Sequence, residues 1–351
     1  MNIDLIATII ALLTFFGIYA LMAISLNLEY GVAGVPNFGQ ALFISLGAYV
    51  TGVTYTRLLP LLAGMEIINP CGTNLAQALQ MRSEIMKTMP IAGFANFAIT
   101  LLIAAIIGGS VGFILSYVTL RLKQEWYLAL VLLVGGEILR IVVRGMDDLI
   151  CSHNGISGVA QPLAFIGDSR TSSVLFMVMV LIIALLAYIY SENLIRSPYG
   201  RLLKAIRENE TVTRSLGKRI SLARAQIMLI GSVIAAISGV LFAVNLGFVN
   251  TNDYVVTLTL NIWVMIVLGG LGNNRGAILG AFIITCLDRF TQVAAIQLNM
   301  SGFTLEFNYV RFILFGIILL LMLRYRPQGL LPESRFTTPA HDVLKHESGE
   351  S

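Results

Sequence analysis

Long apolar stretches alternate with short polar ones along most of the chain. A helix that crosses a membrane needs about 20 mostly apolar residues. Stretches of roughly that length occur at 5–28, 36–55, 93–120, 126–144, 172–191, 226–247, 256–271, 276–297 and 309–325. This pattern predicts an all-α polytopic membrane protein with about nine transmembrane segments. We expect a single membrane domain over residues 1–335 and a polar, disordered cytoplasmic tail over 336–351.

Two of these stretches are interrupted by small and polar residues. The second begins in the glycine-rich run 31–40, and the seventh runs into another at 269–276. Such runs are typical of broken or re-entrant helices. Residues 46–50 also resemble residues 279–283, and each group follows one of the interruptions. Paired interruptions indicate a transport pathway, although the echo can also arise by chance in a chain with 32 glycines.

The composition excludes a soluble globule. Hydrophobic residues make up 57% of the chain and charged residues 12%, whereas soluble domains average roughly 25% charged. The mean hydropathy is +0.83. The net charge of +4 does not indicate a nucleic-acid partner, because the cations lie in loops beside apolar segments, where they meet membrane lipids.

The polar stretch 192–224 is the most basic part of the chain. Its cations are Arg196, Arg201, Lys204, Arg207, Arg214, Lys218, Arg219 and Arg224. Three glutamates oppose these eight cations, which leaves a net charge of +5. Loops rich in Lys and Arg stay on the cytoplasmic side. This orientation places loops 56–92 and 145–171 outside, the N-terminus outside and the C-terminus inside the cytoplasmic membrane.

The same stretch has helical features of its own. Ser197 and Pro198 form an N-cap followed by proline at the first helical position. One helical face carries Tyr199, Leu202, Leu203 and Ile206, and the other carries Arg201, Lys204 and Arg207. Gly217 is placed to end a second short helix. We expect a helix–turn–helix projection at the inner surface; the alternative is a surface helix held to anionic lipid.

Two cysteines fall in the external loops. Cys71 lies in loop 56–92, which also has room for an amphipathic helix near 75–87, and Cys151 lies in loop 145–171. In an oxidising compartment they can form a disulfide that ties the loops together; the alternative is two unpaired thiols. Cys286 lies in the eighth predicted segment.

Charged and polar side chains inside the apolar segments form a second set of candidates. Glu137 and Arg140 are three residues apart on one helical face and can pair, unless Glu137 faces a transport pathway. Asp288 and Arg289 are adjacent and point in different directions, so we expect each to find a partner elsewhere. Uncharged candidates, which line a pathway or bond a neighbouring helix, are Asn27, Asn37, Gln40, Asn245 and Asn261.

Five stretches together resemble one family, the branched-chain amino acid ABC permeases. Residues 196–210 resemble the family's signature loop, RSPYGRLLKAIRENE. The other four are 25–31 with 37–40 and 47–49, then 136–140, 268–272 with 276 and 280–281, and 326–330. The resemblance spans roughly residues 20–332 in the family's order.

The resemblance implies that the basic loop is the element that couples this chain to an ATPase. The residues involved are Gly200, Arg201, Ala205, Arg207, Glu208, Asn209, Glu210 and Gly217. The chain departs from the family at Val212 and Thr213, where two alanines are usual, and we expect this to alter the fit to the ATPase.

By the same resemblance, the chain is the permease subunit of an importer for branched-chain amino acids. The implied partners are a second permease, two cytoplasmic ATPase subunits and an extracytoplasmic substrate-binding protein. ATP would bind to the partner subunits, so we expect no cofactor, no metal and no enzymatic activity on this chain. A urea or short-amide permease and a stand-alone secondary transporter or channel are the alternatives.

Overall fold

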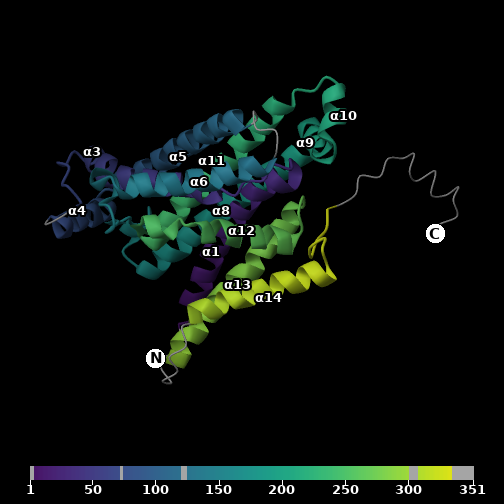
Figure 1. Cartoon of the computed structure of the whole chain (residues 1–351). Coiled ribbons are helices and arrows are strands. Elements are labelled where there is room, and N and C mark those ends of the chain that lie inside the picture. The colour runs from purple at the N-terminus through teal and green to yellow at the C-terminus, as the bar shows by residue number, and fades with distance from the viewer. Residues whose placement is uncertain (1–3, 72–73, 120–124, 300–306, 334–351) are drawn as a thin grey trace.

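The computed structural model describes residues 4–71, 74–119, 125–299 and 307–333 (Figure 1). This part of the chain is mostly helical. Its elements are α1 (Leu5–Leu26), η1 (Asn27–Val32), α2 (Gln40–Val53), η2 (Thr54–Leu58), α3 (Leu59–Leu62), α4 (Leu75–Thr88), α5 (Pro90–Thr119), α6 (Glu125–Arg144), α7 (Asp147–Ile150), β1 (Ile156–Ser157), η3 (Ala164–Ile166), α8 (Ser169–Arg196), α9 (Pro198–Glu208), α10 (Glu210–Ser215), α11 (Ile220–Leu246), β2 (Phe248–Val249), η4 (Thr251–Asp253), α12 (Val256–Gly269), α13 (Asn274–Asn299) and α14 (Phe307–Tyr325).

The chain is a multi-pass helical membrane protein. Each of the nine apolar stretches overlaps a helix, and seven helical stretches are long and apolar enough to cross a membrane. The predicted number of nine is not confirmed. Helix α6 carries Glu137, Arg140 and Arg144, and the apolar run found in α14 covers only Ile313–Met322.

Helix α11 lies at the centre of the bundle. It is buried along most of its length and packs against α5, α2 and α1. A Cβ atom on Gly47 would meet the carbonyl of Ala236, and one on Gly239 would meet the carbonyl of Ile44. Because small residues let membrane helices approach closely, α2 and α11 lie almost backbone to backbone.

A second close pair is formed by α12 and α13, which pack together and against α1. Here Gly280 faces the carbonyl of Met265, as Gly47 faces that of Ala236 in the first pair. The echo at residues 46–50 and 279–283 therefore corresponds to the same packing role in both halves of the chain.

The two predicted interruptions are present and lie against each other. After η1 the backbone is irregular until Gln40, and between α12 and α13 it is irregular from Gly270 to Asn273. The amide oxygen of Asn27 accepts a hydrogen bond from the backbone N–H of Gly272 at 2.9 Å, and its Nδ2 donates to Asn274 at 2.9 Å. One asparagine thus joins two interruptions 245 residues apart.

The loops predicted to be external gather at one end of the bundle. Helix α4 confirms the expected amphipathic helix, and Cys71 and Cys151 form the disulfide, with their Cα atoms 5.2 Å apart. Strand β1 pairs antiparallel with β2 nearby. In Figure 1, α3 and α4 lie at the opposite end from α9 and α10.

Candidate functional site

The predicted helix–turn–helix projection is confirmed as α9 and α10. The Ser197 hydroxyl accepts a hydrogen bond from the Gly200 N–H at 3.3 Å, with proline at the first position of α9. Asn209 caps α10 by accepting from the Val212 N–H at 3.1 Å. Gly217 follows α10 with a φ of +74°, a conformation that favours glycine.

The apolar side of α9 is held against the bundle. Leu203 and Ile206 are buried, and the hydroxyl of Tyr199 donates to the carbonyl of Ala223 at 2.8 Å. A Cβ atom on Gly200 would meet the carbonyl of Ile195, so only glycine fits the corner between α8 and α9. This packing fixes α9 against α8 and α11, so α9 is not a loosely attached surface helix.

Lys204 and Arg207, which were predicted on the polar face of α9, bind one carboxylate that the sequence did not indicate. Lys204 Nζ is 2.7 Å from Glu333 Oε1, and Arg207 Nη2 is 2.7 Å from Glu333 Oε2. Both cations are turned back toward the bundle because this carboxylate lies there. Arg201 and Glu208 remain exposed.

The tip of the projection is both apolar and basic. Val212 is 56% exposed and Leu216 is 72% exposed, and Lys218 and Arg219 beside them are also exposed. Thr213 is buried and donates to the carbonyl of Ala205 at 3.0 Å. Of the two departures from the family pattern, only Val212 can therefore alter a partner's fit directly.

Glu210 anchors α10 to the following helix. Its carboxylate lies 2.6 Å from Arg214 on the same helix and 3.3 Å from Arg224 on α11. Because the second pair joins different elements, it limits rotation of the projection relative to α11.

Glu333 was not found by sequence reasoning, although it lies just beyond the family-like run 326–330. This C-terminal segment crosses the second interruption. The N–H groups of Leu330 and Leu331 donate to the carbonyls of Leu268 and Gly269 at 3.0 and 2.9 Å. Asn273 also donates to the carbonyl of Leu331 at 3.2 Å. The segment therefore fixes Glu333 over the interruption.

Arg207 completes a link between the projection and both interruptions. Besides pairing with Glu333, it donates to the carbonyl of Gly31 in the first interruption. In the second interruption, a Cβ atom added to Gly272 would lie 3.0 Å from Nη1 of Arg207. We call Lys204, Arg207, Glu333 and these two glycines the coupling cluster.

A buried carboxylate, Glu29, was also missed. It is fully buried and accepts from Asn37 Nδ2 at 2.6 Å and Gln40 Nε2 at 3.0 Å. Gln40 also donates to Ser25 at 3.1 Å. The only sequence signal was a charged residue beside an interrupted segment. Two pathway candidates, Asn37 and Gln40, thus hold this carboxylate, while Asn27 joins the two interruptions.

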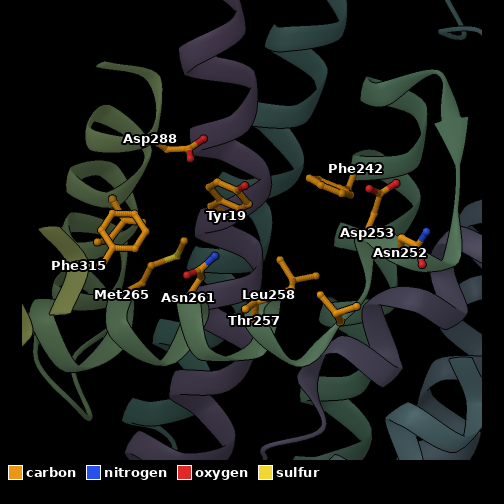
Figure 2. Close-up of a pocket in the computed structure, with 12 residues that line it drawn as sticks. Tyr19, Phe242, Asn252, Asp253, Thr257, Leu258, Asn261, Met265, Asp288 and Phe315 are labelled. Atoms are coloured by element: carbon orange, nitrogen blue, oxygen red, sulfur yellow. The ribbon is translucent and has the colours of Figure 1, made fainter. Parts of the chain in front are cut away.

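The remaining pathway candidates line cavities. Asn261 faces a cavity of about 310 Å³ with Asp253, Asp288 and aromatic side chains around it (Figure 2). Asn245 lines another, of about 430 Å³, beside an ion pair of 2.9 Å between Asp4 and Arg170. The assignment of all five residues to a pathway stays a prediction.

The predicted pairing of Glu137 with Arg140 is present at 2.7 Å, and both side chains are partly exposed. Arg289 finds a partner on another helix, because its guanidinium lies 3.8 Å from the centre of the Phe15 ring of α1. Gln292 bridges Asp288 and Arg289. Its Nε2 donates to Asp288 at 3.0 Å, and its Oε1 accepts from Arg289 at 3.1 Å.

Comparison with known proteins decides the family. A model of the permease component of branched-chain amino acid transport systems matches residues 8–323. The chain belongs to the branched-chain amino acid permease family. It is 35% identical to a probable branched-chain amino acid transport permease protein LivM of Methanocaldococcus jannaschii, over 97% of this chain and 96% of that protein.

Other relatives in this family are more distant. The high-affinity branched-chain amino acid permease LivM of Escherichia coli is 27% identical over 91% of this chain and 68% of its own length. BraD of Pseudomonas aeruginosa, a permease of the same kind of system, is 24% identical over 91% of this chain and 93% of its own. No solved structure matches the chain.

Proposed function

We propose that this chain is the membrane-spanning permease subunit of an ATP-driven importer that translocates branched-chain amino acids. The observation that carries the proposal is the α9–α10 projection, which is rigidly joined to α8 and α11 and linked by Arg207 and Glu333 to both interruptions. The solute is inferred from the relatives, which are named as branched-chain amino acid transport permeases.

The exposed tip suits a cytoplasmic ATPase subunit. Leu216 and Val212 offer apolar anchors, and the cations around them complement an acidic rim on a partner cleft. A charged surface helix that only binds lipid would not need its other face fixed by the partly buried Tyr199 hydroxyl, nor its neighbour α10 fixed by an ion pair to α11.

Movement of the projection would pass directly to the pathway. If an ATPase displaces α9, Arg207 pulls on the carbonyl of Gly31, and Glu333 pulls on the segment that covers Gly269 and Gly270. Irregular backbone at membrane depth occurs where it is buried in protein or lines a cavity. ATP-driven docking can thereby bias two packings of the bundle, which is alternating access.

The remaining parts of the importer follow from this arrangement. A second permease would complete the membrane unit, and two ATPase subunits would bind ATP inside. The disulfide-linked end with α4 and α7 would face the outside, where a solute-binding protein delivers its cargo. The N-terminus is then outside and the C-terminus inside.

The test is leucine uptake and ATP hydrolysis by the assembled complex in proteoliposomes. Leu216→Asp places a charge at the proposed docking tip, so we expect roughly tenfold or greater weakening of ATPase binding and matching loss of uptake. Ile67→Asp, at an equally apolar exposed position in the opposite loop, is the control and should leave ATPase binding unchanged.

Three results would each reject a part of the proposal. Leucine uptake by this chain without ATPase subunits would favour the secondary transporter. Normal ATPase binding and uptake in Leu216→Asp would remove the docking role of the projection. Uptake of urea or acetamide in place of leucine would instead identify the related amide importers.

A further inference from the structure

The cavity lined by Asn261 also has carboxylates in its wall, so its lining is more negative than amide side chains alone would make it. It is lined by residues of α1, α11, η4, α12, α13 and α14, and its lining residues include two carboxylates, Asp253 of η4 and Asp288 of α13. The described residues that line it include no Lys or Arg. In Figure 2, Tyr19 lies between these two carboxylates, and Asn261 lies below Tyr19.

The two carboxylates differ in how far their charge is already compensated. Asp288 is 6% exposed and accepts a hydrogen bond from Gln292, with Arg289 next to it in sequence. Asp253 is half-buried, and its side chain makes no hydrogen bond or ion pair with any residue that the structure describes. Asp253 is therefore the carboxylate available to a ligand.

The other walls of the cavity are apolar and aromatic. Phe242 and Leu258 lie on the side of Asp253, and Met265 and Phe315 lie beyond Asn261 (Figure 2). A volume of about 310 Å³ is at the lower end for small-molecule sites. The cavity thus suits a small molecule that has one cationic group and an aliphatic body.

We propose that this cavity is a solute site that binds the ammonium group of an apolar α-amino acid through Asp253. Asp288 adds to the negative potential, Asn261 offers an amide donor to the solute carboxylate, and the apolar wall contacts the aliphatic side chain. The inference rests on the proposed function and adds to it the residue that recognises the solute.

The test uses the complete complex without its binding protein. A Thr257→Cys reporter, in a Cys286→Ser background, places one reactive thiol at an exposed position in the cavity wall. The rate of labelling by a small thiol reagent is measured with leucine, with 3-methylbutylamine, which lacks the carboxylate, and with 4-methylpentanoate, which lacks the ammonium group.

We expect leucine and the amine to slow labelling, by roughly tenfold at ten times the dissociation constant, and 4-methylpentanoate to leave it unchanged. Asp253→Asn should raise the leucine concentration needed for half-protection by roughly tenfold or more, because it removes a charged hydrogen bond. An Ile67→Cys reporter, at an exposed position far from the projection, is the control, and leucine should not change its rate.

Failure of the inference is distinguishable from failure of the proposed function. Equal labelling with and without leucine, equal protection by 4-methylpentanoate, or unaltered protection in Asp253→Asn would each overturn the site. Leucine uptake by the same complex is measured in parallel. If uptake persists in these cases, only the site is rejected; if the wild-type complex takes up no leucine, the proposed function is rejected as well.

Discussion

At the scale of single residues, Glu333 is the member of the coupling cluster that connects two cations of α9 to the second interruption. Its two oxygens each pair with a different cation of α9, at 2.7 Å, and its own segment bonds to the backbone of the second interruption. A single carboxylate therefore joins the projection to the break between α12 and α13. No other described carboxylate has two cationic partners on α9.

We expect Glu333→Gln to uncouple ATP hydrolysis from uptake. The variant keeps the shape but loses two partly exposed ion pairs, each worth about 0.2–1 kcal/mol. Uptake per ATP hydrolysed should fall several-fold, while assembly with the ATPase stays normal. Glu66→Gln, an exposed glutamate in the opposite loop, is the control. An unchanged ratio of uptake to hydrolysis in Glu333→Gln would remove Glu333 from the link.

Gly31 shows how tightly the interruptions are packed. A Cβ atom there would meet the Asn27 amide oxygen and lie 2.6 Å from the Gly272 nitrogen. Gly31→Ala should therefore break the Asn27–Gly272 hydrogen bond and lower stability by about 1–3 kcal/mol. Thermal unfolding in detergent measures the change. Gly316→Ala, at a helical glycine with open space around it, should be neutral, and equal stability of the two variants would contradict the packing.

The spacing of residues along the chain predicted the local contacts of single residues. It did not predict contacts between residues far apart in the sequence. The Ser197 cap, the Gly217 stop and the Glu137–Arg140 pair depend on residues a few positions apart, which helix geometry alone brings together. Glu333 meets α9 across 126 residues, and nothing in the spacing indicates that distance in sequence. The pairing of Lys204 and Arg207 with Glu333 was consequently not predicted.

At the scale of elements, the apolar pattern was enough to predict the helices but not the irregular backbone between them. Every apolar stretch became a helix, because backbone groups in lipid must bond within the segment. The π-helical turn η1 was not predicted, since glycine content indicates a break without indicating its hydrogen bonds. Among the described helices, α6 is not one of the seven that are apolar enough to cross a membrane, because it carries Glu137, Arg140 and Arg144.

The charge pair of α6 gives a test at this scale. Glu137 and Arg140 are partly exposed beside the apolar Ile138 and Ile141. Removing one partner leaves an uncompensated charge, which costs about 3–5 kcal/mol when fully buried and less here. Each single change to leucine should lower the unfolding temperature, and the double change should recover most of the loss. Loss of uptake at unchanged stability in Glu137→Gln would instead make Glu137 a pathway residue.

At the scale of the whole molecule, two independent features separate the ends of the bundle. The disulfide and α4 lie at one end, and the basic projection and the C-terminal segment lie at the other (Figure 1). Disulfides form in oxidising compartments, and basic loops stay in the cytoplasm. Sequence predicted this separation because charge and cysteine placement act on each loop alone, whereas the cavity around Asn261 needs α1, α11, α12, α13 and α14 to be placed together.

The orientation can be tested with two thiols. In a Cys286→Ser background, Leu216→Cys places one at the projection, and Ile67→Cys places one beside the disulfide end, both at exposed positions. A membrane-impermeant maleimide should label Ile67→Cys in intact cells and Leu216→Cys only in inverted vesicles. The native pair Cys71–Cys151 should react from outside only after reduction. The reverse pattern would place the projection outside, where no ATPase could reach it, and would reject both the orientation and the coupling role of α9.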